Sequence, residues 1–265
     1  MLLGSLIGRM NVWHRWNRWS DAQEAAHSIL QMLEQYQLNE QWQFEALETL
    51  TVIAYRTGQQ EEGDRYFRQY KRLQDRYCTQ AGLSPTMPLV HLAREDWLRA
   101  AADYRELLQR SEPFPSPKIL ASLAELVVIT GESAEEQQII CERAVAVAEQ
   151  SGDQKSLAIA LRSRGRMHLE QQNWQASEED LKQSLHQCKE LDLPWERGKS
   201  LYCLGLLYRR RADCLYKDAS EERTADLGRA HTHFEKALGF FESLNAVNDA
   251  ERARLALGQD NKAPV

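Results

Sequence analysis

The tripeptide Gly198-Lys199-Ser200 carries residue types that bind phosphate, because a lysine and a hydroxyl side chain directly follow a glycine. A nucleotide-binding P-loop also needs a glycine at the position that Leu193 occupies, and no strand pattern precedes the tripeptide. We therefore predict no ATP site here and interpret Lys199 as a residue on a helix surface.

A zinc site is the second candidate, because His231 and His233 could join Cys203 and Cys214 as ligands. Histidines at alternate positions of a helix point in different directions, so they form no tight ligand pair. The five cysteines are odd in number, widely spaced and without a CxxC motif, which predicts reduced thiols. No nucleophile elbow, HExxH helix or supported carboxylate pair occurs either. We predict no catalytic residue, no metal and no cofactor, and hence a protein that is not an enzyme.

The segment WHRWNRW, from Trp13 to Trp19, combines aromatic and basic side chains as single-strand nucleic-acid binders do. Helical spacing predicts that Trp13 and Trp19 are buried, since burying a tryptophan ring removes ~150–250 Å² from water. Only Trp16, with Arg15 and Arg18, is then left as a nucleic-acid contact. The chain has a net charge of −6, which argues against a general polyanion binder.

A sequence repeat underlies these tryptophans. Three segments align on them without gaps: RWSDAQEAAHSIL from Arg18, DWLRAAADYRELL from Asp96 and NWQASEEDLKQSL from Asn173. In each, a small residue follows the tryptophan three positions later, and apolar residues continue at helical spacing. Another amphipathic stretch precedes each segment. A repeat of ~40 residues carried by paired helices predicts a solenoid of antiparallel helical hairpins.

The chain resembles the tetratricopeptide repeat family. The residues that carry the resemblance are Leu161, Gly165, Trp174, Ser177, Leu181 and Ser184 in one copy and Leu201, Leu204, Gly205, Tyr208, Ala230, Phe234 and Ala237 in the next. The copies are similar to the longer repeats of bacterial signal-transduction ATPases and their associated regulators. Residues 38–92 also resemble a bacterial transcriptional activator domain, through Tyr66, Tyr70 and the run from Gly82 to Pro85.

The resemblance implies an all-α, right-handed superhelix of about six hairpins with a C-terminal capping helix. It also implies a protein–protein interaction scaffold that binds a peptide or partner protein in a concave groove. The alternative is the sensor region of a bacterial transcription regulator of the signal-transduction ATPase type.

The predicted hairpins span 3–36, 42–77, 86–110, 118–150, 155–191 and 196–244, with a closing helix at 247–257. Because prolines cluster at 113–117, we predict a bend there between an N-terminal part, 1–112, and a C-terminal part, 118–258, followed by a tail at 259–265. Gly205 and Ala230 are 25 residues apart where Gly165 and Ser177 are 12 apart, so the last hairpin carries a 13-residue insertion near 211–226. We predict that it lengthens the first helix and that KDASEER, 217–223, forms the turn.

In tetratricopeptide arrays the first helix of each hairpin lines the concave groove. By register, the resemblance places five residues there: Arg162, Arg166, Lys199, Tyr202 and Arg209. Guanidinium and ammonium groups bind carboxylates by charge-assisted hydrogen bonds, so we predict an acidic peptide or chain terminus as the ligand.

No apolar run approaches the ~18 residues that a membrane-spanning helix needs, and glycines and Arg9 interrupt the opening decapeptide. We therefore predict a cytoplasmic protein without membrane contact. The first predicted helix starts almost at Met1 without a polar cap, which favours a fragment of a longer chain. The sequence specifies no oligomeric state.

Overall fold

The computed structural model describes residues 2–36, 42–81, 87–216 and 220–260, and within these ranges the chain forms thirteen α-helices and no strand. The predicted all-α fold is confirmed. The run from Gly82 to Pro85, residues 217–219 of the predicted turn and most of the predicted tail lie outside the described residues.

The chain divides into two compact units, unit 1 from Met1 to Asp103 and unit 2 from Tyr104 to Val265, and the division falls inside a helix. Unit 1 holds α1 (Leu2–Arg15), α2 (Trp19–Gln35), α3 (Gln43–Arg56), α4 (Gln60–Ala81), α5 (Pro88–Ala93) and the start of α6 (Trp97–Ser111). Unit 2 holds the rest of α6 and then α7 (Pro117–Ile129), α8 (Ala134–Ser151), α9 (Gln154–Glu170), α10 (Trp174–Glu190), α11 (Pro194–Leu215), α12 (Glu221–Ser243) and α13 (Val247–Asp260). The proline-rich segment 113–117 thus lies within unit 2.

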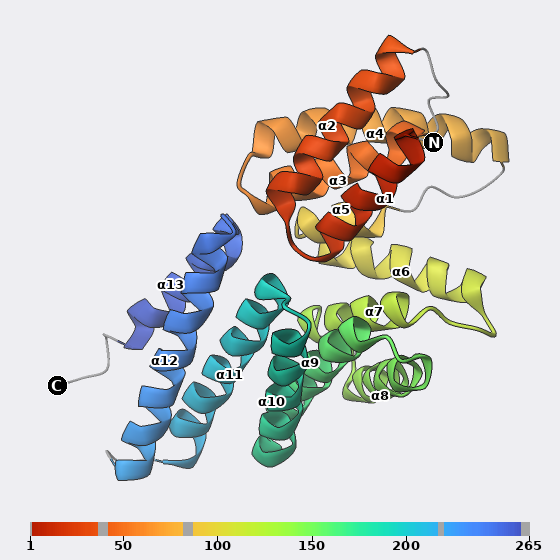
Figure 1. Ribbon diagram of the computed structural model, residues 1–265. Helices are drawn as coiled ribbons and strands as arrows, with labels where there is room; N and C mark the ends of the chain where they lie inside the picture. The colour runs from red at the N-terminus through yellow and green to blue at the C-terminus, as the bar shows by residue number, and fades with distance from the viewer. Residues whose placement is uncertain (1, 37–41, 82–86, 217–219, 261–265) are drawn as a thin grey trace. The chain divides into compact units, whose positions relative to one another are not determined.

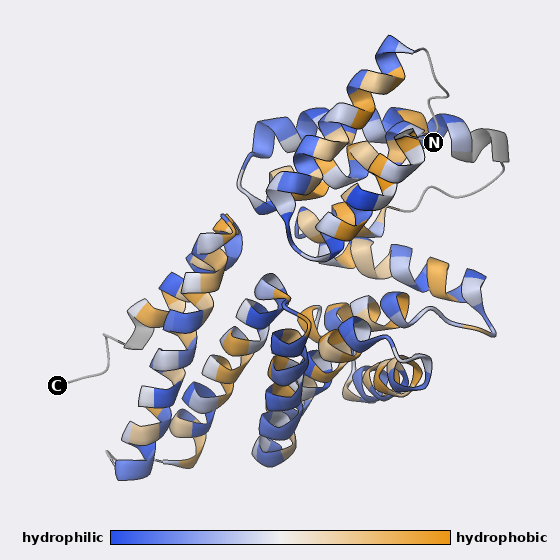
Figure 2. Ribbon diagram, in the orientation of Figure 1, coloured by the Kyte–Doolittle hydropathy of each residue, from blue (hydrophilic) through white to orange (hydrophobic). Residues whose placement is uncertain are grey.

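Helices pair as hairpins within each unit: α1 packs against α2 and α3 against α4 in unit 1, and α7 packs against α8, α9 against α10 and α11 against α12 in unit 2 (Figure 1). Within unit 2, α8, α10 and α12 each also pack against the first helix of the next hairpin, and α9 packs against both α7 and α11. Figure 2 shows apolar residues recurring between polar ones along the helices, and apolar residues at these helical spacings, such as Leu161, Leu181 and Phe234, are buried. The apolar stripes predicted from the sequence therefore mark the buried faces.

The three aligned tryptophans occupy the same structural position. Trp19, Trp97 and Trp174 are the first residues of α2, α6 and α10, the second helices of their hairpins. Each follows a turn with one left-handed residue, Asn17, Glu95 or Gln172, at φ of 60°, 61° and 59°. In each turn the next backbone N–H donates to the carbonyl five residues back, which ends the first helix. Because the turn is so short, the two helices run antiparallel.

Small residues let the paired helices approach each other. A Cβ atom added to Gly165 would lie 2.8 Å from Cγ of Leu181, and one added to Gly205 would lie 2.6 Å from Cε1 of Phe234. All four residues are among those that carry the sequence resemblance. In these two hairpins a large side chain of the second helix thus packs directly against the backbone of a glycine in the first helix.

The last hairpin is longer than its neighbour, with 22 and 23 residues in α11 and α12 against 17 in each of α9 and α10. The predicted extension of the first helix is present. The predicted turn at 217–223 was too long, because the hydroxyl of Ser220 accepts the N–H of Arg223 and starts α12 at Glu221.

A cluster of charged side chains links the extended end of α11 to α12 and α10. The guanidinium of Arg211 donates two hydrogen bonds of 2.7 Å to buried Asp226 on α12 and one of 2.8 Å to Glu178 on α10. Burial alone would raise the pKa of Glu178, but hydrogen bonds involving Lys182, Tyr208 and Arg211 outweigh burial and lower the pKa to about 2. The Glu178 carboxylate therefore joins two hairpins as an anion.

We expect acid to weaken this junction. A carboxyl group whose pKa is lower in the folded state stabilises the fold above its ordinary pKa of 4.5, and that contribution disappears as the pH falls to about 2. Urea unfolding of the wild type and of Glu178→Gln should differ most above pH ~5 and converge towards pH ~2. Glu190→Gln, at the exposed end of α10, controls for the loss of one carboxylate. A difference that stays constant across this range would contradict the prediction.

Candidate functional site

The five predicted groove residues lie on two neighbouring first helices of unit 2. Arg162 and Arg166 belong to α9, and Lys199, Tyr202 and Arg209 belong to α11. Two contacts tie α11 to α13: Nε1 of Trp195 donates to Asp249 at 2.8 Å, and Nη2 of Arg209 donates to the carbonyl of Ala256 at 2.6 Å. We call the exposed side of α9, α11 and α13 the first-helix surface.

Arg162 does not reach this surface. Its side chain is 1% exposed, and Nη2 lies 3.2 Å from Oε1 of Glu125 on α7 and 2.8 Å from Oε2 of Glu196 on α11. The contact to Glu125 is a hydrogen bond, whereas the contact to Glu196 lacks hydrogen-bond alignment and is an ion pair only. The prediction that Arg162 faces a ligand is corrected, because α9 lies between two helices that each supply a carboxylate.

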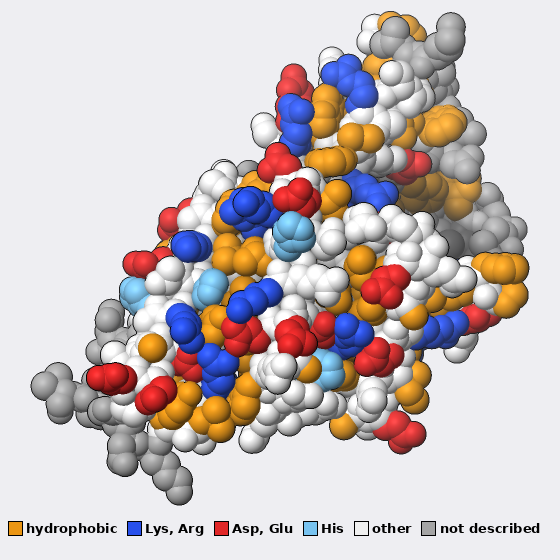
Figure 3. Space-filling model, turned by 60° about the horizontal axis from the view of Figure 1, so that its bottom comes forward, with side chains coloured by type: hydrophobic (Ala, Val, Ile, Leu, Met, Phe, Trp, Pro, Cys, Tyr) orange, Lys and Arg blue, Asp and Glu red, His pale blue; other side chains and the backbone are white. Residues whose placement is uncertain are grey.

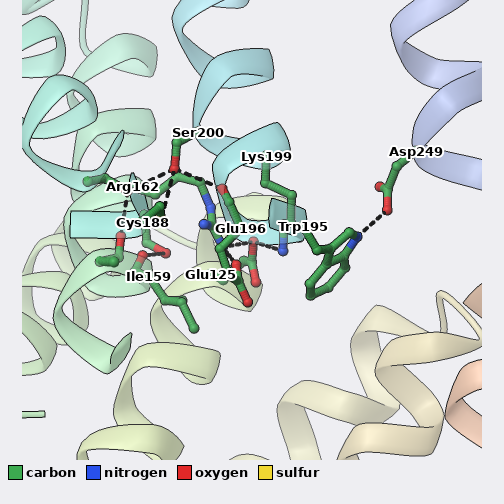
Figure 4. Close-up of polar contacts among 12 residues, drawn as sticks. Glu125, Ile159, Arg162, Cys188, Trp195, Glu196, Lys199, Ser200 and Asp249 are labelled. Carbon is green, nitrogen blue, oxygen red and sulfur yellow. Dashed lines mark hydrogen bonds and ion pairs between the residues drawn. The ribbon is translucent and has the colours of Figure 1, made fainter. Parts of the chain in front are cut away.

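Lys199 lies at the edge of the same cluster. Its Nζ is 2.5 Å from Oε1 of Glu125 and 4.5 Å from the centre of the Trp195 ring, and its side chain is 19% exposed. Lys199 is thus largely buried, although the sequence predicted a surface residue. Figure 4 shows Arg162 among the two glutamates and Lys199 pointing towards them. We call Glu125, Arg162, Glu196 and Lys199 the buried charge network.

Both glutamates of the buried charge network are held as carboxylates. Burial alone would raise the pKa of Glu125, but the charges of Lys199 and Arg162 outweigh burial and hold that pKa well below its usual range. Burial alone would also raise the pKa of Glu196, but the charge of Arg162 outweighs burial and lowers that pKa. Two cations and two anions therefore balance, and the network adds no net charge to the surface above it.

Arg166 and Tyr202 lie on the first-helix surface and are half-buried. Arg166 forms no hydrogen bond or ion pair with any residue that the structure describes. Burial raises the pKa of Tyr202, and the charges of Arg252, Arg166 and Arg209 oppose this rise. Three guanidinium groups thus lie within electrostatic range of one tyrosine hydroxyl, which stays protonated at neutral pH.

Arg209 and Arg252 complete this group. The guanidinium of Arg209 lies 4.5 Å from the centre of the Phe234 ring, and Nη1 of Arg252 donates to Asp249 at 2.9 Å. Sequence reasoning missed Arg252, although it lies in the predicted closing helix, which occupies a first-helix position. We call Arg166, Tyr202, Arg209 and Arg252 the arginine cluster. Elsewhere charges of both signs are interleaved, as on the face turned forward in Figure 3.

The structure also describes the residues that the sequence analysis considered for a zinc site and a nucleic-acid contact. Within the described ranges, no three histidine, cysteine or acidic side chains lie together as metal ligands. The ring of His233 stacks on Tyr208 with centroids 5.4 Å apart. Trp16 is 43% exposed, but Arg18 pairs with Asp21 at 2.7 Å and also lies over the ring of Trp13. Among the described helices, none has the length and apolar content needed to cross a membrane.

The fold is that of all-α helical-repeat proteins. No family model and no curated sequence matches the chain. A Rap protein complexed with competence and sporulation factor aligns with 97% of this chain and 70% of its own, at a TM-score of 0.63 and 10% identity. The apo form of RapI aligns with 98% of this chain and 71% of its own, at a TM-score of 0.55 and 10% identity. At this identity the likeness establishes the fold alone, and it agrees with the tetratricopeptide-like fold predicted from the sequence.

Proposed function

We propose that this protein is a non-catalytic, cytoplasmic scaffold that binds a peptide or partner protein on the first-helix surface of unit 2. The observation that carries the proposal is the arginine cluster, in which Arg166 forms no hydrogen bond or ion pair with the described residues and its charge acts on the hydroxyl of Tyr202. Asp249 pairs with Arg252, and the carbonyl of Ala256 accepts a hydrogen bond from Arg209, so Arg166 is the member of the cluster whose charge is left without a counterion among the described residues. The surface therefore favours an anionic group.

The chemistry of these side chains suits an acidic segment of a protein. A guanidinium binds a carboxylate through two parallel hydrogen bonds, and tyrosine and arginine are the residues that most often anchor protein interfaces. Regular helices hold the backbone of both residues, so only their side chains lose conformational freedom on binding. The Rap structure complexed with competence and sporulation factor supports the proposal, because a protein of this fold there holds a guest molecule.

Arg166→Glu is expected to abolish capture of the partner. The experiment compares wild-type protein, Arg166→Glu and Lys189→Glu as baits in cell lysate, with captured proteins identified by mass spectrometry. Lys189 lies at the exposed end of α10, so its variant controls for the change in net charge. We expect wild type and Lys189→Glu to capture the same protein through an acidic segment. Equal capture by Arg166→Glu would overturn the proposed site.

A further inference from the structure

The buried charge network contains a donor that is not used. Nη1 of Arg162 is buried and has no hydrogen-bond partner among the described residues. Nη2 serves both glutamates, and its bond to Glu125 is long at 3.2 Å. An arginine and a carboxylate bind most strongly through two parallel hydrogen bonds. The unused Nη1 therefore leaves Arg162 with a donor for a second hydrogen bond to Glu125.

Lys199 and Arg162 share Glu125. The ammonium of Lys199 lies 2.5 Å from the same oxygen, Oε1, that accepts the hydrogen bond from Arg162. Lys199 is also the most exposed of the four residues, at 19% against 1% for Arg162 and 10% for Glu125. Lys199 is therefore the member of the network that a group on the first-helix surface reaches most readily.

We infer that Lys199 is a releasable binding residue, which Glu125 holds in the free protein and gives up when a ligand carboxylate draws it to the first-helix surface. Arg162 then takes over Glu125 through its unused Nη1. This inference rests on the proposed function, because it needs an anionic ligand at that surface.

The exchange conserves the number of ion pairs. Lys199 pairs with the ligand carboxylate in place of Glu125. Glu125 loses the ammonium of Lys199 and gains a second hydrogen bond from the guanidinium of Arg162. A neutral ligand offers Lys199 no replacement for Glu125, and leaving the buried carboxylate with fewer partners would cost free energy. The network therefore makes the site selective for an acidic ligand, although Arg162 and Glu125 do not touch it.

The test is a double-mutant cycle with a short end-blocked polyglutamate peptide as the probe and polyglutamine as the neutral control. Glu125→Gln removes the charge that holds Lys199, so we expect it to bind the probe about fivefold more tightly. This gain should vanish in Glu125→Gln/Lys199→Met. Arg162→Lys cannot receive Glu125 at two nitrogens, so it should weaken binding about as much as Lys199→Met, with no further loss when both changes are combined. Lys182→Met on α10 is the control for a lost lysine charge.

A second measurement needs no ligand. The rate at which a small acylating reagent modifies the amine of Lys199, followed by mass spectrometry, should rise several-fold in Glu125→Gln, since that variant removes the carboxylate that holds the protonated side chain. Thermal melting verifies that each variant is folded. If the affinity gain of Glu125→Gln persists without Lys199, the exchange is overturned while the proposed function stands. If the wild type does not bind polyglutamate at all, both are overturned.

Discussion

Gly205→Val is expected to destabilise unit 2 by about 3 kcal/mol, the upper end of what overpacking a core costs. The Cβ atom of the new valine would by itself lie 2.6 Å from Cε1 of Phe234. The Phe234 ring is 0% exposed and therefore cannot move aside. Amide hydrogen exchange along α11 and α12 measures the effect, because it reports the free energy of opening for each helix.

Two further variants separate overpacking from helix propensity. Gly228 lies in α12 with no atom within 4 Å of an added Cβ, so Gly228→Val should change the free energy by no more than ~0.5 kcal/mol. Phe234→Ala removes the ring, so its double variant with Gly205→Val should lose less than the two single variants together. Strictly additive losses would show that Gly205 and Phe234 do not pack as described.

Arg162→Met is expected to cost about 3–5 kcal/mol, the loss typical of breaking a buried ion pair on one side. The variant leaves Glu125 and Glu196 buried together, with Lys199 as the remaining cation of the network. The same exchange measurement along α9 reports this loss. Charge reversal at Arg162 is therefore a test of folding and cannot serve as a test of ligand contact.

Arg166→Met is the matched control for Arg162→Met. Arg166 lies one turn along the same helix on the surface, so its loss should change stability by no more than ~0.5 kcal/mol. Adding Glu125→Gln and Glu196→Gln to Arg162→Met removes the uncompensated charges and should restore much of the lost stability. If Arg162→Met is as stable as Arg166→Met, the buried charge network does not stabilise unit 2.

The site was predicted only in part from the sequence. Register placed Arg166, Lys199, Tyr202 and Arg209 on neighbouring first helices, and the structure finds them there. The register could not predict that Arg162 is buried and Arg166 is not, since residues four apart lie on the same face of a helix. Their environments differ because Glu125 and Glu196, distant in sequence, contact Arg162 and not Arg166. Arg252 joins the cluster through the packing of α12 against α13, which also has no local signal.

The sequence by itself determined the hairpins of this protein. Helical periodicity and the small residue three positions after each aligned tryptophan act over a few turns of chain, so local patterns reveal them. Only the tertiary structure decided which charges are buried and which are exposed. A side chain's partners there come from three separate hairpins, and no local pattern encodes the distance between a guanidinium on α9 and carboxylates on α7 and α11.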